Sequence, residues 1–239
     1  MKMKLYVIYT PSHSCLLNDW FLPTIKDDLS LIIRHLDNNG SGYYRTKGWN
    51  WAILAKTALI IEAINANMGS KFIFSDVDIQ FFDKFECSLD KLSDNYDIIC
   101  QAESPFLNYC TGFFVCRASK VTLQFWEEIL LLIKRNPRWH DQDAFNFLAK
   151  KTKYQHLRFG ILPYQYIGGG TFSGVSWHPG NILPIPKGII MHHANFTKGV
   201  PNKIAQLLYV KRMVTSKILL SIDKITKDLE PDSNGFYTP

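Results

Sequence analysis

The stretch KFIFSDVDIQFF, residues 71–82, indicates both the fold class and the first candidate site. Its apolar beginning, residues 72–74, predicts a buried strand, because a short run rich in isoleucine and phenylalanine is typical of one. Asp76 and Asp78 follow, and the alternation of side chains along a strand predicts that they face the same side. Two carboxylates at the end of a buried strand repel each other and are costly to desolvate. A bound divalent cation would remove that conflict.

The Asp-x-Asp tripeptide is weak evidence by itself, because about one match is expected by chance in a chain of this length. The chain has a second match at 141–143. What distinguishes the first is the strand before Asp76 and the aromatic run after Asp78. Ligands of open α/β sheets bind at the carboxyl ends of strands. The stretch therefore favours a metal site for a diphosphate-bearing ligand, and a solvated turn is the alternative.

The bulk composition bounds the class of protein. The chain has 239 residues, 46% of them hydrophobic and 20% charged, which suits one folded α/β domain and excludes a disordered chain. We expect the domain to span residues 1–230, with a frayed tail over 231–239. The net charge of +6 suits an anionic ligand or an anionic surface. The basic residues form no run beyond pairs, so no nucleic-acid partner is expected.

Cysteine usage and hydropathy bear on the compartment. The five cysteines are odd in number and form no C-x-x-C pattern, which predicts reduced, mostly buried thiols. The apolar part of the N-terminus is too short for a signal peptide, and no run approaches the about 20 apolar residues of a membrane span. We therefore expect a soluble, cytoplasmic protein without a transmembrane segment, and contact with a membrane surface is left open.

Apolar periodicity predicts strands that alternate with helices. The expected strands are 5–9, 71–78, 96–100, 113–117, 161–162 and 189–192. The expected helices are 49–67, one that Ser119 caps and that stops before Pro137, a shorter one within 139–150, and one from Lys203 to about Leu229. Residues 16–36 are expected to be irregular, with a helix opening at Pro23, and 38–42 and 164–180 to be loops. The alternation predicts an α/β protein with a mainly parallel central sheet flanked by helices.

Two further features favour a nucleotide site. A first strand that ends in a small polar loop commonly forms the floor of such a site, so Tyr9 and Thr10 are candidates and an ordinary turn is the alternative. Lys56 lies inside the helix expected at 49–67. It is a candidate cation for the phosphates of a ligand, and a solvated lysine is the alternative.

Four patches stand in order along the chain: FSDVD at 74–78, CTGFFVCR at 110–117, HDQDAFN at 140–146 and HHANFTKGVPNK at 192–203. Together they resemble the nucleotide-diphospho-sugar transferase family of GT-A glycosyltransferases, which is related to the glycogenin-like enzymes. The resemblance covers roughly residues 45–208. It implies a single Rossmann-like GT-A domain that moves a sugar from a nucleotide diphosphate, usually UDP, to a hydroxyl of a glycan or glycoprotein acceptor, with retention of configuration.

The resemblance also implies a metal site. Asp76 and Asp78 would hold Mn²⁺, or Mg²⁺, against the diphosphate, and His193 would complete the site, with His192 as the fallback. Manganese accepts mixed carboxylate and imidazole ligands and leaves positions for phosphate oxygens and water. A metal together with a lysine would stabilise the charge that develops on the leaving diphosphate.

Further residues of the donor side follow from the same resemblance. Gly112, Gly199 and Lys203 fall on motif positions, and the lysine would lie near the phosphates. One departure stands at Cys110, where relatives commonly have asparagine. If that asparagine contacts the donor sugar, the sugar preference of this protein differs.

The resemblance places Asp141 and Gln142 against the sugar and the acceptor, and Asp143 competes for that role. An inverting enzyme would need one of the two aspartates as a base on the acceptor hydroxyl, whereas a retaining one would not. Caps of a helix N-terminus are the alternative for both aspartates. The aromatic residues of the expected loop suit a sugar-binding lid, with core packing as the alternative: Tyr164, Tyr166, Phe172 and Trp177.

Two other functions use related chemistry. A nucleotidyltransferase acting on a sugar phosphate would favour a glycine-rich basic loop after the first strand, and the segment TPSHSCLLNDW has neither glycine nor lysine. A non-catalytic nucleotide- or glycan-binding protein would not need the intact set of Asp76, Asp78, His193 and Lys203.

Overall fold

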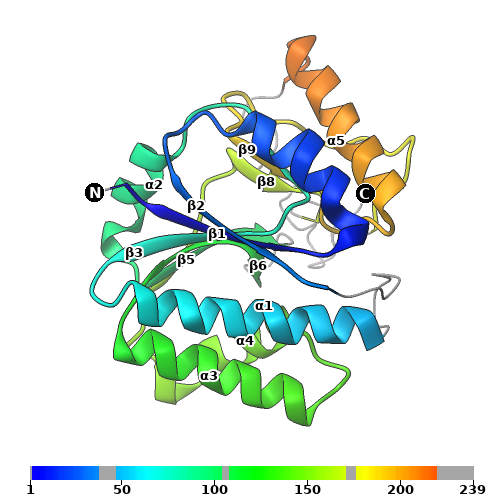
Figure 1. Ribbon diagram of the computed structural model, residues 1–239. Coiled ribbons are helices and arrows are strands. Elements are labelled where there is room, and N and C mark those ends of the chain that lie inside the picture. The colour runs from blue at the N-terminus through cyan, green and yellow to red at the C-terminus, as the bar shows by residue number, and fades with distance from the viewer. Residues whose placement is uncertain (1, 38–46, 104–107, 171–175, 220–239) are drawn as a thin grey trace, which may run out of the picture.

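Six strands form the central sheet of the computed structural model, in the order β2-β1-β3-β6-β5-β7, within the residues that it describes, 2–37, 47–103, 108–170 and 176–219 (Figure 1). Their bounds are β1 Lys4–Tyr9, β2 Ser30–His35, β3 Lys71–Ser75, β5 Ile98–Glu103, β6 Asn108–Arg117 and β7 Phe159–Ile161. Neighbouring strands are parallel except at β6, which runs antiparallel to both β3 and β5. The sheet is therefore mainly parallel, as the alternation of strands and helices predicted.

Helices cover one face of this sheet, and a smaller sheet with a further helix lies over the other (Figure 1). The first layer contains α1 Lys47–Ala66, α3 Lys120–Arg135 and α4 Asp141–Ala149. The second contains strands β4 Ile79–Phe81, β9 Met191–His193 and β8 Tyr166–Gly168, together with α5 Val200–Thr215. Helix α2, Glu86–Leu92, lies close to the N-terminus of the chain, at one end of the sheet (Figure 1).

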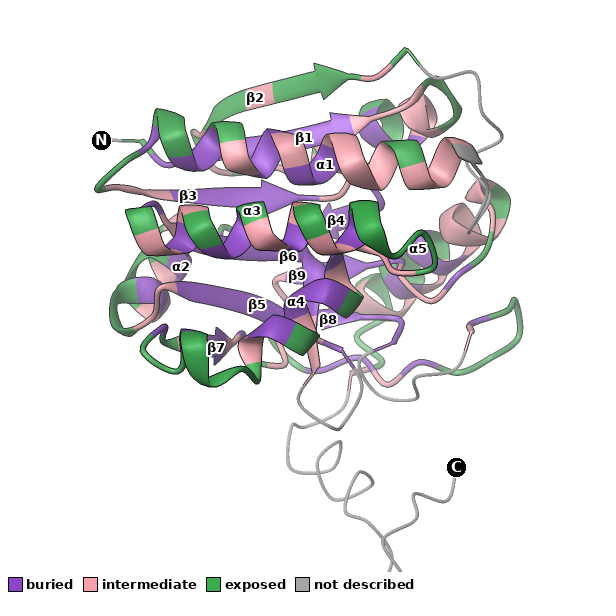
Figure 2. Cartoon of the chain, turned by 90° about the horizontal axis from the view of Figure 1, so that it is seen from below, coloured by how far each residue is buried: buried purple, intermediate pink, exposed green. Residues whose placement is uncertain are grey.

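The two layers explain the apolar run at the start of β3. Phe72 and Phe74 pack into the hydrophobic cluster under α1 and α3, while Ile73 packs into the cluster on the opposite face. A strand that is buried on both faces has no polar side, so its sequence is continuously apolar rather than alternating. Figure 2 shows β3 and β5 as buried along most of their length.

The region 16–36 was predicted to be irregular, with a helix opening at Pro23, and this is wrong. The chain makes short helical turns up to Thr24 and then forms β2, which pairs in parallel with β1. Five of the six residues of β2 are exposed (Figure 2). An exposed edge strand has no buried face to impose a pattern on its sequence, so periodicity missed it. Asp27 accepts hydrogen bonds from the backbone of Phe85 and Glu86 instead of lying in a helix.

The hairpin β5–β6 is longer than predicted. The expected strands covered only 96–100 and 113–117, whereas β5 continues to Glu103 and β6 begins at Asn108. The pairing register shifts between Cys100 and Gln101, which marks a bulge. Beyond the bulge the strand carries polar residues, so the apolar signal ends before the strand does.

The segment 164–180 was predicted to be a loop whose aromatic residues form a sugar-binding lid or pack in the core, and for Tyr166 and Trp177 the structure shows core packing. Tyr166 lies in β8, is buried, and shares a hydrogen bond with the Ser88 hydroxyl at 2.9 Å. Trp177 is only 4% exposed and donates from its indole nitrogen to the carbonyl of Asn181. Both rings are committed to the interior, where burial of aromatic surface stabilises the fold. Tyr164 is partly buried, and Phe172 lies outside the described residues.

The ends of the helices follow from capping. The Ser119 side chain accepts from the backbone N–H of Thr122, which confirms the predicted cap of α3. The last helix was predicted to run to about Leu229, but α5 ends at Thr215. Lys217 then adopts a left-handed conformation with φ of 55°, and Ile218 donates to the carbonyl of Met213, a pattern that closes helices. The predicted loop at 38–42 and the predicted tail at 231–239 lie outside the described residues.

The structure bears on two predictions that concern the whole chain, the absence of a transmembrane segment and the state of the cysteines. Within 2–37, 47–103, 108–170 and 176–219, no helix has the length and hydropathy that crossing a membrane requires. All five cysteines lie in these ranges and none forms a disulfide; Cys100, Cys110 and Cys116 are buried, Cys15 is partly buried and Cys87 is exposed.

Candidate metal and donor site

The turn Asp76-Val77-Asp78 connects the central sheet to the small one. The strand was predicted to continue to Asp78, and this is wrong: β3 ends at Ser75 and β4 begins at Ile79, so the two aspartates lie in the connection between them. The backbone fixes both of them. Asp76 donates from its N–H to the carbonyl of Gly112, at 2.7 Å, and Ala194 donates to the carbonyl of Asp78, at 2.8 Å. These bonds, rather than strand alternation, bring the two carboxylates to β6 and to the end of β9.

Asp76, Asp78 and His193 come together at this turn. One ligand atom from each lies within 4.8 Å of the other two, and no other group of this kind occurs in the part of the chain that the structure describes. The His193 Nε2 atom is 3.3 Å from an Asp78 carboxylate oxygen. The Asp76 side chain is 29% exposed, whereas those of Asp78 and His193 are almost fully buried. The group therefore has one open side.

Gln101 determines which nitrogen of His193 faces the carboxylates. The Gln101 amide nitrogen donates to the carbonyl of Tyr166, so its oxygen is turned towards His193 Nδ1, at 2.9 Å. An amide oxygen can only accept, so this contact holds the Nδ1 side of the ring and directs Nε2 towards Asp78. An imidazole held in this way is ready to bind a cation on the side of the aspartates. No motif in the sequence indicated Gln101, because a single glutamine in a strand belongs to no motif.

Lys203, at the start of α5, forms an ion pair with Asp78 and also donates to the carbonyl of Ala194, at 3.0 Å. Burial alone would raise the pKa of Asp78, but the Lys203 ammonium and the His193 imidazole hold it well below its usual range. Asp78 is therefore ionised. In this structure Lys203 is a partner of that carboxylate; its predicted contact with phosphates stays a prediction.

Lys56 lies between Asp76 and Asp141. Its ammonium is 3.1 Å from a carboxylate oxygen of each, and only 8% of its side chain is exposed. Burial would lower the pKa of Lys56, but Asp141 and Asp76 raise it above its usual value, so the side chain stays charged. The alternative of a solvated lysine is wrong, because the side chain is buried between two carboxylates. The predicted role of Lys56 near the phosphates of a ligand stays a prediction.

A sequence model of the nucleotide-diphospho-sugar transferase family matches residues 22–207. The chain belongs to this family. Its fold is also similar to a solved structure, a glycosyltransferase involved in the glycosylation of the major capsid of PBCV-1, with a TM-score of 0.57 and 9% sequence identity. That likeness covers 89% of this chain and 100% of the other, and it supports the GT-A fold. Among curated proteins, none matches the chain significantly. The family favours glycosyl transfer over the nucleotidyl transfer that the sequence left open.

The loop after β1 of this nucleotide-diphospho-sugar transferase lies near the acidic group, which is the cluster of Asp76, Asp78 and His193. The Thr10 hydroxyl is 3.1 Å from the Nδ1 atom of His13, and the Tyr9 ring packs on His35. Burial lowers the pKa of His13. Of the nearby charges, Asp78 raises this pKa and Lys203 lowers it. The turn that starts at Thr10 therefore reaches towards Asp78 through His13, a residue that the sequence analysis did not single out. Nucleotide contacts of Tyr9 and Thr10 stay predictions.

The three residues of the transferase's Asp-Gln-Asp segment lie at the start of α4 and have different partners. The Asp141 side chain is 3% exposed and accepts from the Thr111 hydroxyl, at 2.7 Å, in addition to pairing with Lys56. Burial would raise the pKa of Asp141, but Lys56 and His140 lower it. The Gln142 side-chain oxygen accepts from Thr111 N–H, at 3.3 Å. Asp143 is exposed and accepts from the backbone of His140, which is the geometry of a helix cap. Their catalytic roles stay predictions.

The remaining candidates of the transferase differ in how close they lie to the acidic group. A Cβ on Gly112 would stand 2.3 Å from His193 Cε1 and 2.9 Å from an Asp76 oxygen, so only glycine fits there. Gly199, with φ of 80°, immediately precedes α5, and its carbonyl accepts from the backbone N–H of Lys203.

His192 is buried on the other side of β9, and both of its ring nitrogens lack a partner among the described residues. Burial lowers the pKa of His192 to about 3. His193, not His192, belongs to the group with Asp76 and Asp78.

Proposed function

We propose that this transferase is a metal-dependent glycosyltransferase that moves a sugar from a UDP-sugar to a hydroxyl of a glycan or glycoprotein acceptor. The observation that supports this is the convergence of Asp76, Asp78 and His193 within 4.8 Å, at the end of β3 and with one open side. A group of this kind suits a divalent cation bound to a diphosphate. The family makes a sugar attached to that diphosphate the substrate.

The ligand set favours Mn²⁺ over Mg²⁺. Mg²⁺ prefers oxygen ligands throughout, whereas Mn²⁺ accepts an imidazole beside carboxylates. The Nε2 atom of His193 is directed towards Asp78, because Gln101 holds the Nδ1 side of the ring. Asp76 and Asp78 would hold the ion together with His193, and when bound it would supply positive charge against the leaving diphosphate.

The chain's own residues would prepare and maintain this arrangement. Lys56 and Lys203 each hold one of the two carboxylates in place, and Gln101 holds the imidazole. In the reaction the bond between the anomeric carbon and the diphosphate oxygen breaks, and the nucleoside diphosphate leaves with the electron pair. A bond forms from the anomeric carbon to the acceptor oxygen, and the proton of that hydroxyl passes to the leaving diphosphate. We infer retention, because neither candidate base is unengaged: Asp141 pairs with Lys56 and Thr111, and Asp143 caps α4 through the backbone of His140.

Thermal stability in the presence of UDP tests the proposal. A ligand that binds only the folded protein stabilises it by about 2.7 kcal/mol at a hundredfold excess over its dissociation constant. We expect UDP with Mn²⁺ to raise the melting temperature, UDP alone to raise it little, and GDP with Mn²⁺ to raise it less than UDP does. Release of UDP from a panel of UDP-sugars would then identify the donor. Stabilisation that is the same with and without Mn²⁺ would contradict the metal dependence.

The fit of Gly112 against two metal-binding candidates provides a second test. In Gly112→Ala, the new methyl group displaces His193 or Asp76, because neither contact is long enough to be accommodated. We expect Mn²⁺ affinity, measured by calorimetry, to fall on the order of tenfold or more, since small shifts of ligands cost that much. Gly160→Ala, in β7, is the matched control, because its Cβ would crowd the Tyr96 ring instead. An unchanged Mn²⁺ affinity in Gly112→Ala would argue against this site.

A further inference from the structure

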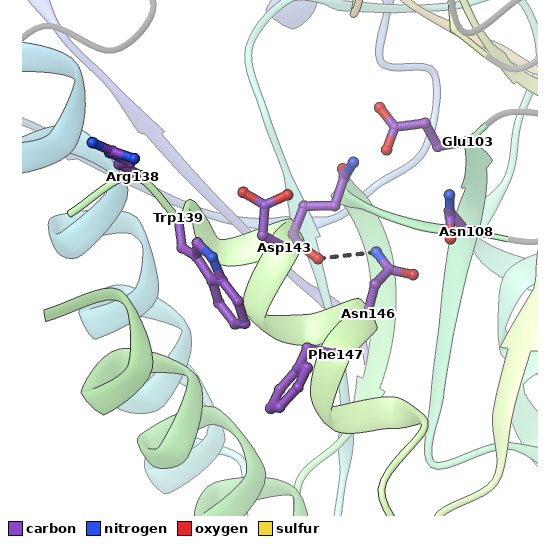
Figure 3. A pocket seen from close by; sticks show the side chains of 8 residues that line it. Glu103, Asn108, Arg138, Trp139, Asp143, Asn146 and Phe147 are labelled. Atoms are coloured by element: carbon purple, nitrogen blue, oxygen red, sulfur yellow. Dashed lines mark hydrogen bonds between the residues drawn. The ribbon is translucent and has the colours of Figure 1, made fainter. Parts of the chain in front are cut away.

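A pocket of about 520 Å³ opens between the end of the β5–β6 hairpin and helix α4 (Figure 3). It is lined by Glu103, Asn108, Arg138, Trp139, Gln142, Asp143, Asn146 and Phe147. Figure 3 shows Glu103 and Asn108 on the strand side and Asp143, Asn146 and Phe147 on the helix side. Its volume lies within the range of about 300–1,000 Å³ that is usual for small-molecule sites.

The pocket adjoins the acidic group through α4. Gln142 lines the pocket, and its neighbour Asp141 pairs with Lys56, which in turn pairs with Asp76. The Gln142 side chain is bound to the backbone of Thr111, one residue before the glycine that packs on His193. A molecule in this pocket would therefore lie beside the site proposed for the donor, separated from it by the first turn of α4.

Glu103 is the unusual residue of this pocket. It is only 6% exposed, and its carboxyl group has no hydrogen bond or ion pair with any residue that the structure describes. Burial raises the pKa of Glu103 to about 8, helped by the charges of Asp141 and Asp143 and opposed by Lys56. Near pH 7 the group is mostly uncharged, with one hydrogen-bond donor and one acceptor available. A buried polar group without a partner is costly, so this carboxyl suits a ligand.

The other walls of the pocket indicate the ligand's chemistry. Trp139 and Phe147 pack edge to face, with ring centroids 5.2 Å apart, and provide apolar surface. Asn146 is committed to the backbone of Tyr109 and Gln142, so it supports the wall rather than offering free groups. Arg138 is the one cationic side chain among the eight lining residues, and it is exposed. Aromatic surface beside hydrogen-bonding groups, with acidic neighbours, favours an uncharged polyhydroxyl ligand over an anion.

We propose that this pocket is the acceptor subsite, that it binds an uncharged sugar residue, and that Glu103 hydrogen-bonds to one of its hydroxyls. The term acceptor rests on the proposed function, because only transfer at the adjoining site makes the bound sugar an acceptor. Binding itself does not depend on the donor and is measured separately from it. Uronic-acid residues are disfavoured, because their carboxylate would meet the carboxylate of Asp143, which lines the pocket.

Saturation-transfer NMR on the full chain, without UDP or metal, tests the subsite. The probes are neutral methyl hexosides and pentosides and the methyl glycosides of the corresponding uronic acids. We expect saturation transfer to at least one neutral glycoside, and about tenfold or more weaker binding of its uronic-acid counterpart, because like charges brought together are strongly unfavourable. A protein that gives no signal with any neutral glycoside, or that binds the uronic acid equally well, overturns the proposal.

Variants of Glu103 identify its part in that binding. Glu103→Ala removes the hydrogen-bonding group and is expected to weaken binding of the neutral glycoside roughly three- to tenfold, the value of one net hydrogen bond. Glu103→Gln keeps a donor and an acceptor, so binding should stay within about threefold. Glu127→Ala, on the exposed face of α3, is the control and should bind like the wild type. Equal affinity of Glu103→Ala and the wild type overturns the role of Glu103.

The pH dependence separates a neutral carboxyl from a charged one. The titratable and charged groups that face Glu103 are Asp141 and Asp143 from α4, Lys56 from α1, Cys110 from β6 and Arg138 before α4. Raising the pH from 7 to 9 should ionise Glu103 and weaken glycoside binding in the wild type, whereas binding in Glu103→Gln should stay level. A level profile in the wild type overturns the neutral form. Failure of UDP and Mn²⁺ to stabilise the protein contradicts the proposed function alone, since glycoside binding is measured without them.

Discussion

Asp78→Ala is expected to abolish metal-dependent binding of UDP and to lower transfer on the order of a thousandfold, since a catalytic metal contributes several kcal/mol. Asp78 touches both other parts of the arrangement: it pairs with Lys203 and lies 3.3 Å from His193 Nε2. Removing its carboxylate takes away one proposed ligand and leaves the Lys203 ammonium without its anionic partner. The measurement is the shift in melting temperature by UDP with and without Mn²⁺, followed by UDP release from the donor.

Two further variants make that result interpretable. Asp78→Asn keeps the shape of the side chain and serves where the alanine variant loses stability. Asp83→Ala removes an exposed aspartate a few residues along the same segment, whose oxygen accepts only from the neighbouring Lys84 N–H among the described residues. It should respond to UDP and Mn²⁺ like the wild type. If Asp78→Asn also keeps the full metal-dependent shift, the proposed metal site is wrong.

Lys56→Met is expected to lower the free energy of unfolding by about 3–5 kcal/mol, which is the cost of removing one partner from a buried ion pair. Methionine fills a similar volume, so the loss would come from Asp76 and Asp141 being left without the cation between them. Chemical denaturation followed by circular dichroism measures the change. The comparison on the same helix is Glu62→Gln, which breaks the exposed pair with Arg34 and should cost less than about 1 kcal/mol.

A double variant tests the stated cause of that loss. If buried charge is responsible, Asp141→Asn placed in Lys56→Met should recover part of the lost stability, because it removes one of the two unpaired carboxylates. We expect a coupling of about 1–3 kcal/mol, in the range measured for residues of one network. Losses that simply add in the double variant would show that Lys56 contributes through packing and not through its charge.

Local patterns predicted a large part of this protein. The apolar run before Asp76 predicted β3, because a strand buried on both faces has to be apolar at every position. The periodic residues of 49–67 predicted α1, and Ser119 predicted the start of α3. His193 and the two aspartates were paired through a resemblance of short motifs, and they do lie together. Each of these signals is contained within a few neighbouring residues.

The features that were predicted wrongly, or not at all, have a different cause. Strand β2 exists because β1 offers it a partner, and its exposed sequence carries no periodicity. For Tyr166 and Trp177 a lid and core packing were both left open, because composition does not distinguish an aromatic loop from an aromatic core; both side chains are buried. Glu103 was overlooked, since a single acidic residue at the end of a strand is ordinary, and only the fold buries it beside a pocket that α4 also lines.

The sequence by itself determined the class of fold, the central strand and which residue types are available to hold a cation and a diphosphate. Only the tertiary structure decided their partners: Lys56 with Asp141, Gln101 with His193, and Glu103 with none among the described residues. The physical reason is that the character of an ionisable side chain depends on its burial and on charges within a few ångströms. Those neighbours come from segments far apart in the chain, so no local pattern records them.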